Sequence, residues 1–317
     1  MNAVKVISPG ALTTIQDAGR FGYLQSGISV SGVMDGYSHR TANLLVDNPP
    51  EEAVLEVTLM GPVLEFLTGT RIAVTGAAMQ PQVNGQPAPM WQTIPVKQGD
   101  RLSFSPIKSG CRAYIAFAGG LDVPVVMGSK STNLKAQIGG FQGRMLKRDD
   151  IVPIKAPSGP EKLWAADTRY IPEYPKQITL RVVLGPQDQA FTREGIADFL
   201  NTEYRVTPAN DRMGYRLEGK EIAHATGADI VSDGIVMGAV QVPSSGQPII
   251  LMADRQSTGG YTKIATVVTA DLPLLAQAQA GTVVRFRKVD VEEAQKLLKE
   301  FHEKIEAFAR SRKSVTA

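Results

Sequence analysis

The amino-acid sequence predicts a mainly β protein, built as barrels or sandwiches with short inserted helices and one amphipathic helix near the C-terminus. Glycine (30) and proline (20) are spread along the 317 residues. The runs between them are short and rich in β-branched residues, which is typical of strands bounded by turns. Few helical patterns separate these runs, so the sequence disfavours parallel βαβ winding and favours a barrel or sandwich.

The predicted strands are spread along the whole chain. The Asn84–Gly85 pair adds a strong hairpin signal after the extended segment 81–83, because both residues tolerate the positive φ of a tight turn. The clearest strands are predicted at residues 4–7, 71–74, 113–117, 181–184, 248–252 and 283–286.

The last predicted element is a helix that begins after Asp290. Glu293 follows three residues later, and this spacing is a capping-box pattern. Apolar residues then recur at helical spacing, which indicates packing against the body of the protein or against a partner. These residues are Val291, Ala294, Leu297, Leu298, Phe301, Ile305 and Phe308.

Turn-rich segments between residues 156 and 176 predict a domain boundary. We expect a first domain at residues 1–165, a second at 176–289, and a terminal helix with a solvated tail at 290–317. The segment 181–186 weakly repeats 5–10, because both are strands that run into a Gly/Pro turn, and this echo favours a duplicated β unit.

Composition narrows the classes of partner and compartment. Hydrophobic residues make up 43% of the chain and the formal net charge is +3, a balance that predicts neither a nucleic-acid nor a membrane partner. We expect no secretory signal, and no run approaches the ~20 apolar residues that cross a bilayer. The single cysteine, Cys111, cannot form an internal disulfide and fits a reducing cytoplasm.

The well-known catalytic and cofactor motifs are missing from the sequence. It has no phosphate-binding loop, dinucleotide-binding glycine motif, HExxH zinc motif, GxSxG elbow or biotin-carrying Met-Lys-Met segment. With one cysteine, a Cys/His zinc site is excluded, and we predict no metal. Cys111 is expected to be a small core residue, and His39 to lie on the surface of a short helix.

Two glycine-framed segments concentrate polar residues instead. In the first, residues 13–62, glycines allow close backbone approach, so that carboxylates and a guanidinium can face a polar ligand. An internal Asp17–Arg20 pair that only shapes the loop fits equally well. The polar residues of this segment are Asp17, Arg20, Asp35, Asn43 and Glu56.

The second segment covers residues 210–263, where the strand at 248–252 leads directly into a polar run. Donors and acceptors are thereby concentrated at a strand end, where sites are often built on a rigid frame. The polar residues that follow the strand are Asp254, Arg255, Gln256, Thr258, Tyr261 and Lys263.

Three long strings in these segments carry a family resemblance. They are Thr-Ile-Gln-Asp-x-Gly-Arg-x-Gly (14–22), Gln-Val-Pro-x-x-Gly-Gln-Pro-Ile (241–249) and Asp-Arg-Gln-x-Thr-Gly-Gly-Tyr (254–261). Over residues 4–288 the chain resembles the 5-oxoprolinase C-subunit / allophanate hydrolase subunit 2 family, which includes the KipA proteins and the carboxyltransferase portion of urea carboxylase. The resemblance implies two cyclophilin-like β-barrel domains, in agreement with the duplicated pattern.

The resemblance also implies a function within a complex. With the A subunit, and with the KipI-like B subunit, such a chain helps convert 5-oxo-L-proline to L-glutamate with ATP hydrolysis, and ATP is expected to bind elsewhere in the complex. One alternative is a biotin-dependent carboxyltransferase component that acts on urea or a related amide, with biotin supplied on a separate chain. Another is a KipA-like regulator that binds a KipI-type kinase inhibitor.

We predict a site for a small amide from these residues. Lys263 would stabilise developing negative charge, and Tyr261 or Gln256 would orient a carbonyl group. The predicted catalytic residues are Asp254, Gln256, Tyr261 and Lys263, and the predicted substrate-binding residues are Arg20, Asp35, Asn43, Glu56, Arg212, Gln241 and Thr258.

Each of these predictions has a purely structural alternative. Asp254 and Thr258 would instead hydrogen-bond the backbone of the Gly259–Gly260 turn. Arg212 and Arg216 flank a Met-Gly pair, and either faces an anion or forms an ordinary ion pair.

Overall fold

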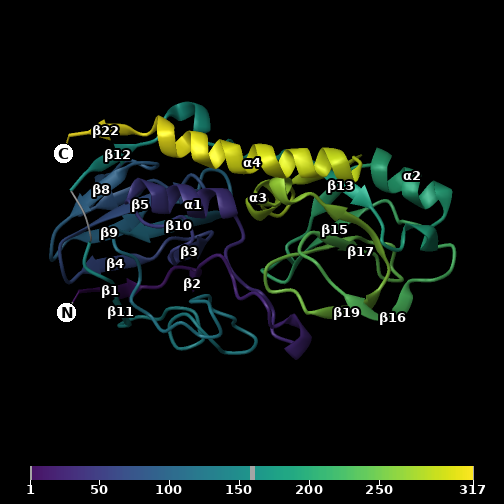
Figure 1. Ribbon diagram of the computed structural model, residues 1–317, viewed down its shortest axis with the longest axis horizontal. Helices are drawn as coiled ribbons and strands as arrows, with labels where there is room; N and C mark the ends of the chain where they lie inside the picture. Colours follow the sequence, from purple (N-terminus) through teal and green to yellow (C-terminus); the bar gives the residue numbers. More distant parts are fainter. Residues whose placement is uncertain (1, 158–160, 317) are drawn as a thin grey trace. The chain divides into compact units, whose positions relative to one another are not determined.

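The structure is a computed structural model that describes residues 2–157 and 161–316 (Figure 1). The chain forms two compact units. The first takes the residues up to Phe21, Ser31–Tyr174 and the chain from Glu303 onward, and the second takes Gly22–Val30 and Pro175–His302. The predicted linker lies partly outside the described residues, at 158–160. The predicted domain ranges stay a prediction, and the compact units divide at Tyr174 and Pro175.

In its described residues, the first unit contains two large antiparallel sheets and one two-stranded sheet, described below with the C-terminus, rather than one closed barrel. One sheet has the order β11 (Ile151–Pro153), β1 (Ala3–Ser8), β4 (Val63–Phe66), β9 (Arg101–Phe104), β6 (Pro81–Val83) and β7 (Gln86–Pro87). The other has the order β2 (Leu12–Gln16), β3 (Val54–Thr58), β10 (Arg112–Phe117), β5 (Thr70–Gly76) and β8 (Thr93–Val96). Both sheets contribute to a single apolar core.

The core of the first unit lies where these two sheets meet. Phe66 of β4 and Phe117 of β10 approach to 6.4 Å between ring centroids. Every residue of β5 and β10 is buried, because helix α1 (Gly36–Leu45) packs on these strands and covers their other face (Figure 1). A strand covered on both faces reads as a continuous apolar run, which explains why the sequence identified these two clearly.

The second unit contains a closed barrel. Its strand order is β13 (Gln177–Leu184), β20 (Lys263–Val267), β17 (Ala239–Gln241), β18 (Ile249–Leu251), β15 (Gly214–Gly219), β14 (Tyr204–Val206) and β21 (Val283–Lys288). β13 and β21 are parallel, and the other neighbours are antiparallel. A separate ribbon pairs β16 (Asp229–Gly234) with β19 (Thr258–Tyr261).

Short helices complete both units. In the second unit, Phe199 of α2 (Arg193–Asn201) stacks on Phe286 of β21 at 4.2 Å between centroids. The other short elements are α3 (Leu272–Ala276) and the 3-10 turns Leu24–Ser26, Thr168–Tyr170, Asp188–Ala190 and Thr269–Asp271. No helix in the described ranges is both long and apolar enough to span a bilayer.

The mainly β prediction is confirmed, and each predicted strand overlaps an observed one. The predicted hairpin is also confirmed. Asn84 and Gly85 connect β6 and β7 with φ values of 53° and 78°, as a two-residue turn with both φ values positive requires.

The C-terminal helix α4 (Val291–Ser311) begins as predicted, because the Asp290 carboxylate accepts the backbone N–H of Glu293 at 2.7 Å. The predicted solvated tail is confirmed only in part, because Arg310 and Lys313 are exposed whereas the Arg312 side chain is only 16% exposed. Residues Lys313–Val315 form β22, which pairs with β12 (Leu163–Ala165). The Arg312 guanidinium lies 4.7 Å from the ring centroid of Trp164 and donates to the carbonyl of Leu44, which also accepts the Asp47 N–H. An aromatic ring and a backbone carbonyl therefore hold a segment that its own sequence marks only as basic.

Candidate functional site

The second unit contains a cavity of about 480 Å³ on the outer face of its barrel, within the range of small-molecule sites. Side chains alternate along a strand, and the register pairs Val240 with Ile250 and Ile250 with Tyr215. These three are fully buried and form an inner row. The next residues therefore point outward.

The outward residues make a row of their own. Arg216 of β15 pairs with Ile249 of β18, and Ile249 pairs with Gln241 of β17. All three line the cavity, and Gln256 and Tyr261 complete the wall from the segment that follows β18. The structure thus brings together three of the predicted site residues, Gln241, Gln256 and Tyr261, although their role as ligand contacts stays a prediction.

Three glutamines line the cavity, and they differ in how their amides are used. The Gln247 amide is occupied, because it accepts from the N–H of Gly219 and donates to its carbonyl. Gln241 is only 2% exposed, and its amide nitrogen makes one long bond of 3.4 Å to the carbonyl of Tyr261. Within the described ranges, neither the Gln241 carbonyl oxygen nor the Gln256 amide has a hydrogen bond.

Gly259 allows these two amides to approach the β19 backbone. A Cβ atom at this position would lie 2.7 Å from Nε2 of Gln241, 3.4 Å from Nε2 of Gln256 and 2.5 Å from Cδ1 of Ile235. A side chain at position 259 would thus displace these side-chain ends, whereas a Cβ at Gly260 would make only ordinary contacts, the nearest at 3.5 Å. Gly259 leaves two amide groups beside each other at the cavity wall.

Two residues predicted as site groups form a buried ion pair with each other. The Arg212 guanidinium donates to both Asp254 carboxylate oxygens, at 2.9 and 3.1 Å, and both side chains are buried. The backbone N–H of Asp254 also donates to the Arg212 carbonyl at 2.8 Å. The pair joins the segment before β15 to the segment after β18, so it fixes two edges of the cavity wall.

Lys263, predicted as catalytic, also has a carboxylate partner. Its buried ammonium donates to Asp233 at 2.8 Å, and Gln187 bonds both residues, at 3.1 Å to the Lys263 N–H and 3.3 Å to the Asp233 carboxylate. The hydrogen bond from Lys263 lowers the pKa of Asp233. Thr258, predicted to bind substrate, lies exposed at the start of β19 opposite Gly234.

Arg255 is a buried cation that the predicted site omits. Its guanidinium donates to the carbonyls of Ile235 and Met252, at 3.1 and 3.2 Å. Burial lowers the pKa of Arg255 to about 10. The Asp-Arg-Gln string was the available signal, but a bond to backbone carbonyls leaves no pattern in sequence.

The predicted first-segment residues lie in the first unit, and most are held by protein groups. Asp35 caps α1 by accepting the N–H groups of Tyr37 and Ser38, each at 3.0 Å. Glu56 accepts from the Met34 N–H at 2.8 Å and from the Tyr114 hydroxyl at 3.0 Å. These contacts support the structural alternative, and their role in binding stays a prediction.

Arg20 and Asp17 bond to the same distant loop. Arg20 donates to the carbonyls of Val126 and Ser131, at 3.0 and 2.9 Å. Asp17 accepts from the hydroxyls of Ser129 and Ser131, at 2.6 and 2.5 Å, and from the Lys130 N–H at 2.6 Å. Burial raises the pKa of Asp17, but these hydrogen bonds outweigh it and leave the pKa below its usual value.

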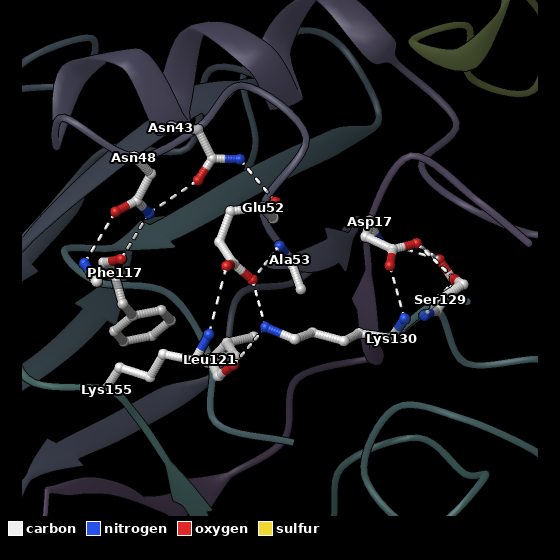
Figure 2. A network of polar contacts seen from close by, with 12 residues as sticks. Asp17, Asn43, Asn48, Glu52, Ala53, Phe117, Leu121, Ser129, Lys130 and Lys155 are labelled. Carbon is white, nitrogen blue, oxygen red and sulfur yellow. Dashed lines mark hydrogen bonds and ion pairs between the residues drawn. The ribbon is translucent and has the colours of Figure 1, made fainter. Parts of the chain in front are cut away.

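Figure 2 shows how this loop is joined to the end of α1. The Lys130 ammonium bonds the Glu52 carboxylate at 2.5 Å and the Leu121 carbonyl at 2.8 Å. Asn43, a predicted binding residue, donates to the Glu52 carbonyl at 2.7 Å and accepts from Asn48 at 3.0 Å (Figure 2). The network ties three chain segments together, and Asn43 is part of it.

One expectation about α1 is wrong. His39 does not lie on the surface: it is 1% exposed, with Nε2 2.8 Å from the Glu52 carbonyl, because α1 is covered on the side that carries it. Burial lowers the pKa of His39. Cys111 is buried as expected, and burial raises the pKa of its thiol.

A closed β-barrel with an amide-lined cavity in one unit and a two-sheet core in the other define the class of this protein as a mainly β protein of two units. Residues 26–288 match the family described as "Carboxyltransferase domain, subdomain A and B", and the chain belongs to this family. The family predicted from the sequence strings is thereby confirmed.

Individual relatives fall into two groups. The chain is 40% identical to the C subunit of 5-oxoprolinase from Escherichia coli over 92% of this chain and 93% of the relative. It is 34% identical to urea amidolyase of Saccharomyces cerevisiae over 93% of this chain but 17% of the relative. The crystal structure of K. lactis urea amidolyase superimposes with a TM-score of 0.90 at 32% identity, covering 96% of this chain and 20% of that one.

Proposed function

We propose that this chain is a subunit of an ATP-dependent 5-oxoprolinase, which converts 5-oxo-L-proline to L-glutamate. The similarity to the C subunit of the E. coli enzyme supports this proposal, because it extends over 92% of this chain and 93% of the relative. The structural observation that carries it is the Gln241 side chain, which lines the cavity, is 2% exposed, and has a carbonyl oxygen without a hydrogen-bond partner in the described parts of the chain.

A Gln241 carbonyl oxygen without a protein partner favours a ligand that donates a hydrogen bond to it. A hydrogen bond from a ligand N–H to this oxygen would contribute about 0.5–1.5 kcal/mol. The lactam of 5-oxoproline is a planar amide with one N–H donor and one carbonyl acceptor, and glutamine side chains offer the complementary groups. Gln241 and Gln256 would therefore orient the lactam in the cavity.

The four residues predicted as catalytic divide into two roles in this proposal. Gln256 and Tyr261 line the cavity, and they would donate to the lactam oxygen as water attack builds negative charge there. Asp254 and Lys263 are proposed to support the wall through their ion pairs with Arg212 and Asp233. The remaining steps are assigned to the partner chains of the complex.

ATP is proposed to bind to a partner chain, because the cavity does not fit a triphosphate. Arg216 is the single basic side chain among the residues that line it, and Asp211 adds a carboxylate of the same charge sign as the phosphates. ATP supplies the free energy for opening the lactam, and no step here is assigned to it. The relatives are named as subunits, which supports a multi-chain complex, and we propose that the partners are the A and B subunits of the enzyme.

A second candidate is a carboxyltransferase component that acts on urea or a related amide. The TM-score of 0.90 with K. lactis urea amidolyase favours it. Biotin would then take part, and its ring is a cyclic urea that the same two glutamine amides would fit. The chain matches only about a fifth of that protein, so carrier and carboxylase functions would have to come from other chains.

The decisive experiment measures glutamate formed from 5-oxoproline and ATP by the purified A and B subunits, with and without this chain. We expect activity only when the chain is present. Absence of glutamate in the complete mixture, with urea-dependent ATP hydrolysis in a biotin-containing mixture instead, would replace the proposal with the second candidate. We place the protein in the cytoplasm, because a single cysteine cannot form an internal disulfide, as suits a reducing compartment.

A further inference from the structure

In the outward row of the barrel, a guanidinium and an amide lie on two strands that are separated by one strand. Arg216 and Gln241 both pair with Ile249, from opposite sides. Neighbouring strands lie ~4.8 Å apart, so the two Cα atoms are separated by about 10 Å. The long arginine side chain and the shorter glutamine side chain both line the cavity, and Ile249 between them provides an apolar floor.

Arg216 lacks the partner that every comparable arginine in this site has. Arg212 is paired with Asp254, and Arg255 donates to two backbone carbonyls. The Arg216 side chain has no ion pair or hydrogen bond with any residue in the described ranges. Its guanidinium is therefore a cation at the cavity wall with its donors available.

Asp211, the other charged residue at this wall, is committed elsewhere. One carboxylate oxygen accepts the N–H groups of Met213 and Gly214, at 2.7 and 3.1 Å. It therefore shapes the turn into β15 and forms no ion pair with Arg216 in the described structure. Its negative charge opposes a polyanion, so a single carboxylate fits this wall better than a phosphate group.

We propose that Arg216 binds the carboxylate of the amide ligand while Gln241 binds its amide, so that the cavity selects amides that also carry a carboxylate. The planar guanidinium fork matches a carboxylate through two parallel N–H donors. This inference rests on the proposed function, since 5-oxoproline has both groups, and it names Arg216 as the residue that separates such ligands from neutral amides such as urea.

The test compares two ligands that differ only in the carboxylate. Binding of 5-oxoproline and of 2-pyrrolidinone, the same lactam without a carboxylate, is measured on the full chain by ligand-observed NMR titration. The variants are Arg216→Met and Arg216→Lys, and the control is Arg205→Met. Arg205 is an exposed arginine on the neighbouring strand β14 and lies outside the cavity lining.

We expect the wild-type chain to bind 5-oxoproline more tightly than 2-pyrrolidinone by about ten- to a hundredfold, the usual contribution of charge-assisted hydrogen bonds. Arg216→Met should abolish this preference without changing 2-pyrrolidinone binding. Arg216→Lys should retain part of the preference, because it keeps the charge but not the fork. Arg205→Met should match the wild type.

Three results would overturn the inference. They are an unchanged preference in Arg216→Met, an equal loss for both ligands, which would make Arg216 a structural residue, and no binding of either ligand to the full chain. The glutamate assay with the A and B subunits separates these results from a failure of the proposed function. Glutamate formation that does not respond to Arg216→Met would leave the function standing and remove only the role of Arg216.

Discussion

At the scale of single residues, the cavity wall includes a glycine at which an added Cβ atom would displace neighbouring side chains. This residue is Gly259, where an added Cβ would lie 2.7 Å from the Gln241 amide and 2.5 Å from Ile235. Gly234, which lies in β16 on the same ribbon, has open space around its Cα. The two glycines form a matched pair for separating cavity effects from effects on the ribbon.

We predict that Gly259→Ala lowers the free energy of unfolding by about 1–3 kcal/mol, the usual cost of overpacking, and weakens lactam binding by displacing the Gln241 amide. Gly234→Ala should change neither quantity. Urea unfolding and the NMR titration measure both. Equal behaviour of the two variants would show that Gln241 accommodates the methyl group and that its position is not fixed by this contact.

The Arg212–Asp254 pair is a second residue-scale feature, with both side chains buried. We predict that Asp254→Asn costs about 3–5 kcal/mol of unfolding free energy, because it removes one charge of a buried ion pair while the guanidinium stays buried. Glu203→Gln is the control, since its partner Arg285 is exposed and such pairs contribute about 0–1 kcal/mol. A stable Asp254→Asn variant that has lost activity would favour a direct catalytic role for Asp254 over the supporting role proposed above.

At the scale of elements, helix α1 carries a buried histidine whose neutral form is favoured in the folded state. His39 is buried against the Glu52 carbonyl, and burial lowers its pKa below the usual 6.5. As pH falls through 6.5, the unfolded chain takes up a proton at this residue and the folded chain does not. The folded state therefore loses stability below this pH and is unaffected above it.

We predict that the unfolding free energy of the wild type falls below about pH 6.5 with a contribution from His39 of up to ~1.4 kcal/mol per pH unit. His39→Gln keeps a donor for the Glu52 carbonyl but cannot titrate, so its profile should be flatter by this amount. His302→Gln, an exposed position on α4, is the control. Urea unfolding at a series of pH values tests this, and identical slopes for wild type and His39→Gln would contradict it.

The elements also show what a single sequence can predict. β5, β10 and β13 were predicted because β-branched runs between glycines and prolines encode strands locally. The contacts of Asp17 and Arg20 were not predicted, since their partners lie more than 100 positions away in the Val126–Ser131 loop. A local motif cannot reveal such partners.

The site was predicted only in part, because a sequence shows local patterns of polar residues but not their distant partners. Gln256 and Tyr261 are predicted because polar residues gather at a strand end, and Gln241 is predicted as a substrate-binding residue; all three line the cavity. The two arginines beside Met213 have the same local sequence pattern, yet Arg212 is paired with Asp254 and Arg216 is not. Arg212 lies before β15, whereas Arg216 lies within β15 and pairs with Ile249 of β18. This difference depends on strand register, which is a property of the folded sheet.

At the scale of the whole molecule, the first unit is assembled from three separate stretches of chain, the last of which begins at Glu303. Phe308 of α4 is fully buried and meets the ring of Tyr170 edge-on at 6.3 Å. Ile305 is also buried, and β22, which follows the helix, pairs with β12. The C-terminal residues are thus part of the core of this unit, whatever further role α4 has in assembly.

We predict that deleting residues 290–317 destabilises the first unit by several kcal/mol, because burial of each large apolar side chain such as Phe308 or Ile305 contributes about 2–5 kcal/mol. A chain that ends after Val315 should retain wild-type stability, since it keeps both α4 and β22.

Lys296→Glu, at a position whose side chain is 74% exposed, should leave the fold intact and alter only partner binding through α4. Thermal unfolding and co-purification with the B subunit of the enzyme separate the two effects. Unchanged stability of the 290–317 deletion would mean that the C-terminal residues are dispensable for the core and serve assembly alone.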